Sequence, residues 1–219
     1  MLRFEKVLRH GLMAIAATAF LAAPATARGR VPDTKTLSCD QVARYFRIDR
    51  DEAGPLMQAI LCQDAAKVRV VLSQGVDPNE NLGNESALRV AVRLGATEII
   101  ESLISAGADI NGNESDHYTP LLAAIDYFIE TSDWRPFDLL ITSGADPAIR
   151  TKNPPFTIPE HLALIGQYKK IHDLLDRGYR RELGVLLDLI ESTREYGAAP
   201  DRKEKRLVAR IQSMIDASR

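Results

Sequence analysis

Apolar and polar positions along the chain form short blocks of helical periodicity, and glycine closes each block. In residues 98–105, for example, Ile99, Ile100, Leu103 and Ile104 share one wide face of a helix of two to three turns. Comparable blocks are closed at steps of 32, 37 and 34 residues by Gly75, Gly107, Gly144 and Gly178. A period in the low thirties indicates stacked units that bury their apolar faces against one another.

These units resemble the ankyrin repeat family, whose signature is a T-P-L-H-x-A turn and helix, then a second helix that closes on G-A-D. The first helices begin at Gly54-Pro55-Leu56, Ser86-Ala87-Leu88, Thr119-Pro120-Leu121 and Thr157-Ile158-Pro159, and Gly107-Ala108-Asp109 and Gly144-Ala145-Asp146 match the closing motif. The resemblance implies an all-α fold: an ankyrin-type helical-hairpin solenoid of about four repeats over residues 54–179, with short projecting loops.

Amphipathic segments flank the repeats on both sides. Ser38 and Gln41 have the spacing of a capping box, which predicts an N-terminal capping helix within residues 38–53. Residues 180–219 predict two amphipathic helices that form a C-terminal helical cap, because the open end of a solenoid needs a polar outer face. In the third repeat, Asp133 is expected to cap a second helix that has Pro136 in its first turn.

The first 27 residues have the pattern of a cleaved secretory signal peptide. Basic residues precede an apolar run that is too short to span a membrane, and Ala25-Thr26-Ala27 ends it. Residues 28–37 follow as a flexible linker. Cleavage removes three basic residues and one acidic residue, which moves the net charge from −2 to −4. The mature protein is therefore expected to be soluble in the periplasm or secreted by a bacterium, without stable membrane insertion or nucleic-acid binding.

The two cysteines of the chain are expected to form a disulfide, as an even number of cysteines usually does in an exported protein. Cys39 opens the capping helix and Cys62 closes the first helix of the first repeat. Antiparallel packing of these helices would bring the two residues side by side.

Catalytic and metal-binding patterns are weak. His161 and His172 are eleven residues apart, and neither G-x-S-x-G nor a P-loop occurs. We therefore expect no catalytic residue, no metal and no cofactor. Asp126 and Glu130 are four residues apart on one helix, which is more typical of a solvated face than of an acid/base pair.

The remaining candidates are surface residues for protein recognition. The resemblance implies that partners contact the projecting loops and the concave side formed by the first helices. Because these residues lie outside the apolar pattern, the fold is not expected to need them. The predicted partner-binding residues are Glu85, Arg93, Asp116, Tyr118, Asp126, Tyr127, Arg150 and His161. Trp134 is expected to cover the seam to the next repeat, beside Phe128 and Phe137, rather than to bind a partner.

The sequence thus predicts a non-enzymatic module, monomeric when free, that binds a protein partner in the periplasm. The resemblance implies either neutralisation of a toxic effector or support of a periplasmic enzyme. The alternative is a small periplasmic enzyme or ligand sensor on the same scaffold, which would need a pocket near Tyr127 and His161.

Overall fold

The computed structural model describes residues 36–83, 85–112, 118–151, 155–193 and 201–218. The predicted signal peptide and nearly all of the predicted linker lie outside these ranges. The described residues form helices and one short β-hairpin, and they divide into two compact units that meet in sequence at residues 151 and 152.

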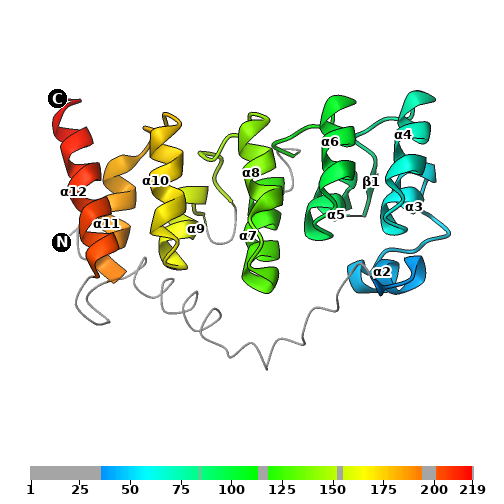
Figure 1. Cartoon of the computed structure of the whole chain (residues 1–219), viewed down its shortest axis with the longest axis horizontal. Helices are drawn as coiled ribbons and strands as arrows, with labels where there is room; N and C mark the ends of the chain where they lie inside the picture. The colour runs from blue at the N-terminus through cyan, green and yellow to red at the C-terminus, as the bar shows by residue number, and fades with distance from the viewer. Residues whose placement is uncertain (1–35, 84, 113–117, 152–154, 194–200, 219) are drawn as a thin grey trace. The chain divides into compact units, whose positions relative to one another are not determined.

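In the N-terminal unit, the described residues form a single helix followed by three helical hairpins (Figure 1). Its first helices contact one another in chain order, as do its second helices, and α2 contacts α3. This is the solenoid arrangement that the sequence predicts. The elements are α2 (Cys39–Phe46), α3 (Pro55–Leu61), α4 (Ala65–Ser73), β1 (Asn81–Leu82), β2 (Glu85–Ser86), α5 (Ala87–Arg93), α6 (Thr97–Ser105), α7 (Pro120–Thr131) and α8 (Arg135–Thr142).

The core of this unit consists of the apolar faces that the periodicity identifies. All six side chains that the pattern places between neighbouring repeats are at most 3% exposed, which confirms the predicted register: Leu88, Ala91, Ile100, Leu103, Leu121 and Ala124. Ile104, predicted on the same face as Leu103, is only half-buried at its edge.

Polar side chains begin the helices where the sequence predicts them. Ser38 and Gln41 form the capping box of α2, and the hydroxyls of Ser86 and Thr119 accept hydrogen bonds from Arg89 N and Leu122 N. The glycine at position 54 has no hydroxyl, but the Glu80 carboxylate lies where a side chain there would be. A carboxylate at a helix N-terminus is favourable because of the helix dipole.

One helix begins later than predicted. The N-cap of α8 is Trp134 rather than Asp133, although Pro136 does lie in the first turn. The Asp133 carboxylate instead accepts a hydrogen bond from Arg135 N two residues later, at 3.0 Å. This local turn satisfies a free N–H of the first turn, so Asp133 has a capping effect from one position farther out.

An asparagine ladder joins successive turns of the repeats. Asn79 Oδ1 accepts a hydrogen bond from Asp109 N at 2.7 Å, and Asn111 Oδ1 accepts one from Asp146 N at 2.8 Å. The equivalent position in the third turn is Ala148. Since alanine has no side-chain amide, the third turn cannot extend the ladder.

The described residues of the C-terminal unit form the helices α9 (Ile158–Leu164), α10 (Tyr168–Asp176), α11 (Leu183–Thr193) and α12 (Arg202–Asp216). Helix α11 packs on α9 and α12 packs on α10. The two C-terminal helices therefore repeat the hairpin stacking of the helices before them. Across all described ranges, every helix is too short or too polar to cross a membrane.

Candidate partner-binding site

Two arginines of α5 share one carboxylate at the start of the second repeat. Glu85, on the β2 strand, accepts from Arg93 Nη1 at 2.8 Å and from Arg89 Nη2 at 3.4 Å. The β1–β2 hairpin positions it, with Leu82 paired to Glu85. The Arg89 side chain is 4% exposed, whereas Arg93 and Glu85 are 26% and 20% exposed. Arg93 and Glu85 are thus held in place and still reach the surface.

Arg89 connects Glu85 and Arg93 to the start of α7. Its Nη1 donates to the carbonyl oxygen of Tyr118 at 3.3 Å, and its guanidinium carbon lies 5.5 Å from the centre of the Tyr118 ring. The Tyr118 hydroxyl donates a hydrogen bond to the Asp126 carboxylate. Burial, followed by the charge of Asp126, raises the pKa of Tyr118. The phenol therefore stays protonated and remains a donor.

Arg93 connects Glu85 to α2, the N-terminal helix. Its guanidinium carbon lies 4.5 Å from the ring centre of Phe46 and 5.8 Å from that of Tyr45. Burial raises the pKa of Tyr45, and the charge of Glu130 on α7 raises it further. We call the seven linked residues the first-helix network: Tyr45, Phe46, Glu85, Arg89, Arg93, Tyr118 and Asp126.

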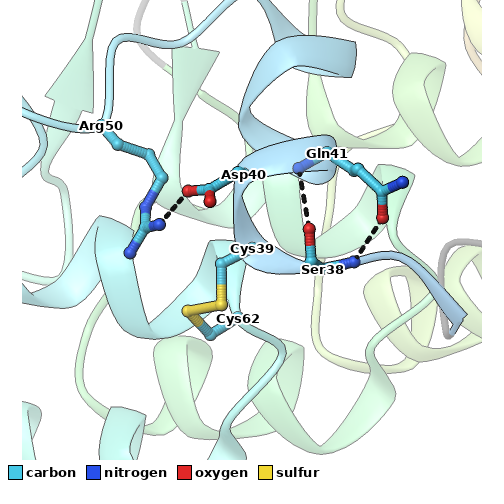
Figure 2. Close-up of a disulfide and its surroundings, with 6 residues drawn as sticks. All are labelled: Ser38, Cys39, Asp40, Gln41, Arg50 and Cys62. Carbon is cyan, nitrogen blue, oxygen red and sulfur yellow. Dashed lines mark hydrogen bonds and ion pairs between the residues drawn. A yellow bond between two sulfur atoms is a disulfide. The ribbon is translucent and has the colours of Figure 1, made fainter.

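A disulfide lies at the other end of α2. Figure 2 shows Cys39 bonded to Cys62, which is the C-cap residue of α3. The capping box of Ser38 and Gln41 is adjacent, and Asp40 forms an ion pair with Arg50 (Figure 2). Helix α2 is therefore joined to α3 covalently at its first residue.

Four of the eight predicted partner residues thus belong to one network: Glu85, Arg93, Tyr118 and Asp126. Tyr127 does not belong to it. A Cβ atom on Gly95 would overlap the Tyr127 hydroxyl, which lies 3.5 Å from Asp133 Oδ2. Tyr127 therefore packs against the turn between α5 and α6.

The other three predicted residues are scattered. Asp116 lies outside the described residues, and Arg150 is half-buried after the third turn. His161 is on α9 in the C-terminal unit, edge-on to the Phe156 ring at 5.6 Å between ring centres. Burial lowers the pKa of His161 to about 4, which keeps the imidazole neutral near pH 7.

The Trp134 side chain packs against the aromatic residues that lie near it in the sequence. Its ring stacks on Phe128 at 3.8 Å and meets Phe137 edge-on at 5.1 Å. The three rings come from α7, α8 and the turn between them. Trp134 thus packs within its own hairpin, against the two aromatic residues that were predicted to lie beside it.

Sequence reasoning missed three members of the network. Arg89 occupies the position of the family's histidine, which was a visible signal for an inter-repeat role. Tyr45 and Phe46 belong to the apolar face of the capping helix, and that pattern by itself indicates packing rather than a contact with Arg93. The described residues contain no group of three or more His, Cys, Asp or Glu that could hold a metal ion. The network presents paired charges and aromatic rings, which suit recognition by contact.

Comparisons with known proteins agree with this architecture. A family model described as ankyrin repeats (3 copies) matches residues 56–151. An ankyrin repeat protein of Fowlpox virus (strain NVSL) is 40% identical over 72 residues, which are 32% of this chain and 10% of that relative. The chain thus matches only about a tenth of the viral protein.

The matched region includes all three hairpins of the N-terminal unit, and the hairpin of α9 and α10 lies beyond it. Ankyrin repeats typically serve as non-enzymatic scaffolds for protein binding. Residues 56–151 thus form ankyrin repeats, and these repeats together with the helical-hairpin fold indicate a protein–protein interaction module within the chain.

Proposed function

We propose that this chain is an exported, non-enzymatic protein that binds a protein partner in the bacterial periplasm through the first-helix network. The observation that carries the proposal is the continuous set of contacts from Phe46 through Arg93, Glu85 and Arg89 to Tyr118. These contacts join α2, β2 and α5 to the start of α7 on the side of the first helices.

The composition of this surface supports recognition of a protein. Tyrosine and arginine are the residue types that most often carry binding energy in interfaces. Arg93 is partly exposed and already oriented by Glu85, so little side-chain entropy remains to be lost when a partner binds. Paired charges of both signs can set the orientation of the partner.

Two biological roles are consistent with such a module. The partner is either a toxic effector that the chain neutralises or a periplasmic enzyme that it supports. Identification of the partner distinguishes the two roles, because only the first predicts that loss of the chain makes the partner harmful to the cell.

The binding test compares a variant of an arginine on the first helices with a variant of an arginine on the second helices. Tagged wild-type protein is cross-linked in cells, and a stoichiometric partner is identified and purified. Arg93→Ala should weaken its binding at least about tenfold, equivalent to about 1.4 kcal/mol. The control is Arg69→Ala, since Arg69 is 57% exposed and pairs with Glu98 at 3.7 Å between α4 and α6. Equal loss in both variants, or none in Arg93→Ala at unchanged thermal stability, contradicts the proposed face.

The location is tested separately. Cell fractionation should recover the protein in the periplasm or the medium, and mass spectrometry of the purified protein should give an N-terminus at or near Arg28. Retention of Met1, or recovery only with membranes, would show that the chain is not exported as a soluble protein.

A further inference from the structure

We propose that α2 is part of the partner-binding face and that the Cys39–Cys62 disulfide controls it, so that oxidation assembles this part of the face and reduction loosens it. The proposal rests on the proposed function for the existence of a partner. The effect of the disulfide on the position of α2, in contrast, does not depend on a partner.

Helix α2 contributes directly to the network. Phe46 is 6% exposed and supports the Arg93 guanidinium from inside, whereas Tyr45 is half-buried. Tyr45 therefore contacts Arg93 and also reaches the surface. Its hydroxyl lies within the electrostatic influence of Glu130 and Asp126 on α7. A partner that contacts the exposed part of Arg93 would consequently meet Tyr45 as well.

The position of α2 depends on few contacts. The helix has eight residues, and isolated helices of that length are unstable in water. Three of its side chains are buried, Val42, Ala43 and Phe46. The disulfide adds a covalent link to the C-terminal end of α3. Without this link, only noncovalent contacts hold the helix, chiefly those of these three side chains, and the aromatic support of Arg93 becomes mobile.

The disulfide is accessible to chemistry, because Cys39 and Cys62 are both only half-buried. A dithiol reductant supplies two electrons and two protons. The bond between the two Sγ atoms breaks, each sulfur becomes a thiol, and the dithiol is oxidised to its own disulfide. Reoxidation reverses the same exchange, so the change is reversible.

Amide hydrogen exchange of the purified full chain tests the proposal without any partner. In the oxidised protein, residues 38–48 should be protected. After treatment with dithiothreitol, their exchange should accelerate at least tenfold, while residues 97–105 of α6 and 202–216 of α12 keep their protection. A variant with Cys39→Ser and Cys62→Ser should exchange quickly in residues 38–48 without reductant and should not respond to it.

Two results would overturn the proposal. Equal protection of residues 38–48 in both redox states would show that packing alone holds α2. Loss of protection that extends to residues 97–105 would show that the disulfide supports the whole N-terminal unit.

The purified partner from the arginine experiment provides the binding readout. Reduction, or Tyr45→Ala in the oxidised protein, should weaken binding at least tenfold, whereas Tyr168→Ala in the C-terminal unit should not. Unchanged binding after reduction or after Tyr45→Ala excludes α2 from the face. If no partner binds the wild-type chain, the proposed function fails, but the exchange result still decides whether the disulfide controls α2.

Discussion

Individual polar side chains of the candidate site have roles within the fold. Tyr118 shows this best, because its backbone carbonyl accepts from Arg89 and its hydroxyl donates to Asp126. From the sequence, Tyr118 lies outside the apolar pattern, so the fold was not expected to need it. The structure revises that expectation, since a half-buried hydrogen bond to a carboxylate also stabilises the repeat that contains it.

Removal of the Tyr118 hydroxyl should therefore destabilise the protein measurably. Tyr118→Phe keeps the ring beside Arg89 and removes the charge-assisted hydrogen bond to Asp126. We expect a loss of about 1.5 kcal/mol in the free energy of unfolding, measured by urea denaturation. An unchanged midpoint would show that water replaces this bond at no cost.

His161 should make stability depend on pH. Its folded-state pKa of about 4 lies below the ordinary value of 6.5, so the unfolded chain binds the proton more readily. The stabilisation is complete above pH 6.5 and is lost as the pH falls toward 4. Linkage gives a loss of about 2 kcal/mol between pH 7 and pH 5.

The control for this prediction is the other described histidine. Burial and Arg210 lower the pKa of His172, so it acts in the same direction. His161→Gln should flatten the urea-denaturation profile between pH 7 and pH 5, and His172→Gln should leave most of the slope. Parallel profiles for wild type and His161→Gln would contradict the assignment.

At the scale of secondary-structure elements, the turns between helices determine how the hairpins are spaced. Gly95 has a φ of +65° between α5 and α6, and Tyr127 of α7 covers it directly. Gly75, which follows α4, has a φ of +83° but nothing within 4 Å of a built Cβ. The two glycines therefore share a positive φ that would strain any other residue, and they differ in the steric contact that a side chain would meet.

This difference predicts unequal effects of alanine. Gly75→Ala should cost about 1 kcal/mol, the usual penalty of a left-handed backbone. Gly95→Ala should cost more than about 2 kcal/mol, because Tyr127 must also move. The double variant Gly95→Ala, Tyr127→Ala should lose less unfolding free energy than the sum of the losses of the two single variants. A double-mutant cycle by urea denaturation measures this difference. Additive losses would mean that the overlap is relieved without strain.

At the scale of the whole molecule, buried side chains shared by neighbouring hairpins stabilise the N-terminal unit. Leu103 of α6 is fully buried, and α6 contacts both α4 and α8. Leu103→Ala should cost about 2 to 5 kcal/mol. The control is Val70→Ala on α4, which should stay within about 0.5 kcal/mol because Val70 is 55% exposed. Equal losses in chemical denaturation would mean that the stack does not depend on Leu103.

The sequence by itself determined the repeat class, the buried faces and most of the helix starts. Glycine spacing, apolar periodicity and caps such as Ser38 and Thr119 act over a few residues, so they can be identified without coordinates. The boundary at Asp133 was one residue off, because an aspartate can satisfy the same N–H groups from either position.

Only the tertiary structure decided which polar residues act together. Glu85, Arg89 and Tyr118 are brought together by the β1–β2 hairpin and by the packing of α5 against α7. Tyr45 and Arg93 lie 48 positions apart and meet because α2 folds onto α3. Side-chain direction and inter-repeat contacts depend on how the hairpins stack. Apart from the family position that Arg89 occupies, the local sequence carries no signal for them. The same reason separates Tyr127 from the network, although it is adjacent to Asp126 in the chain.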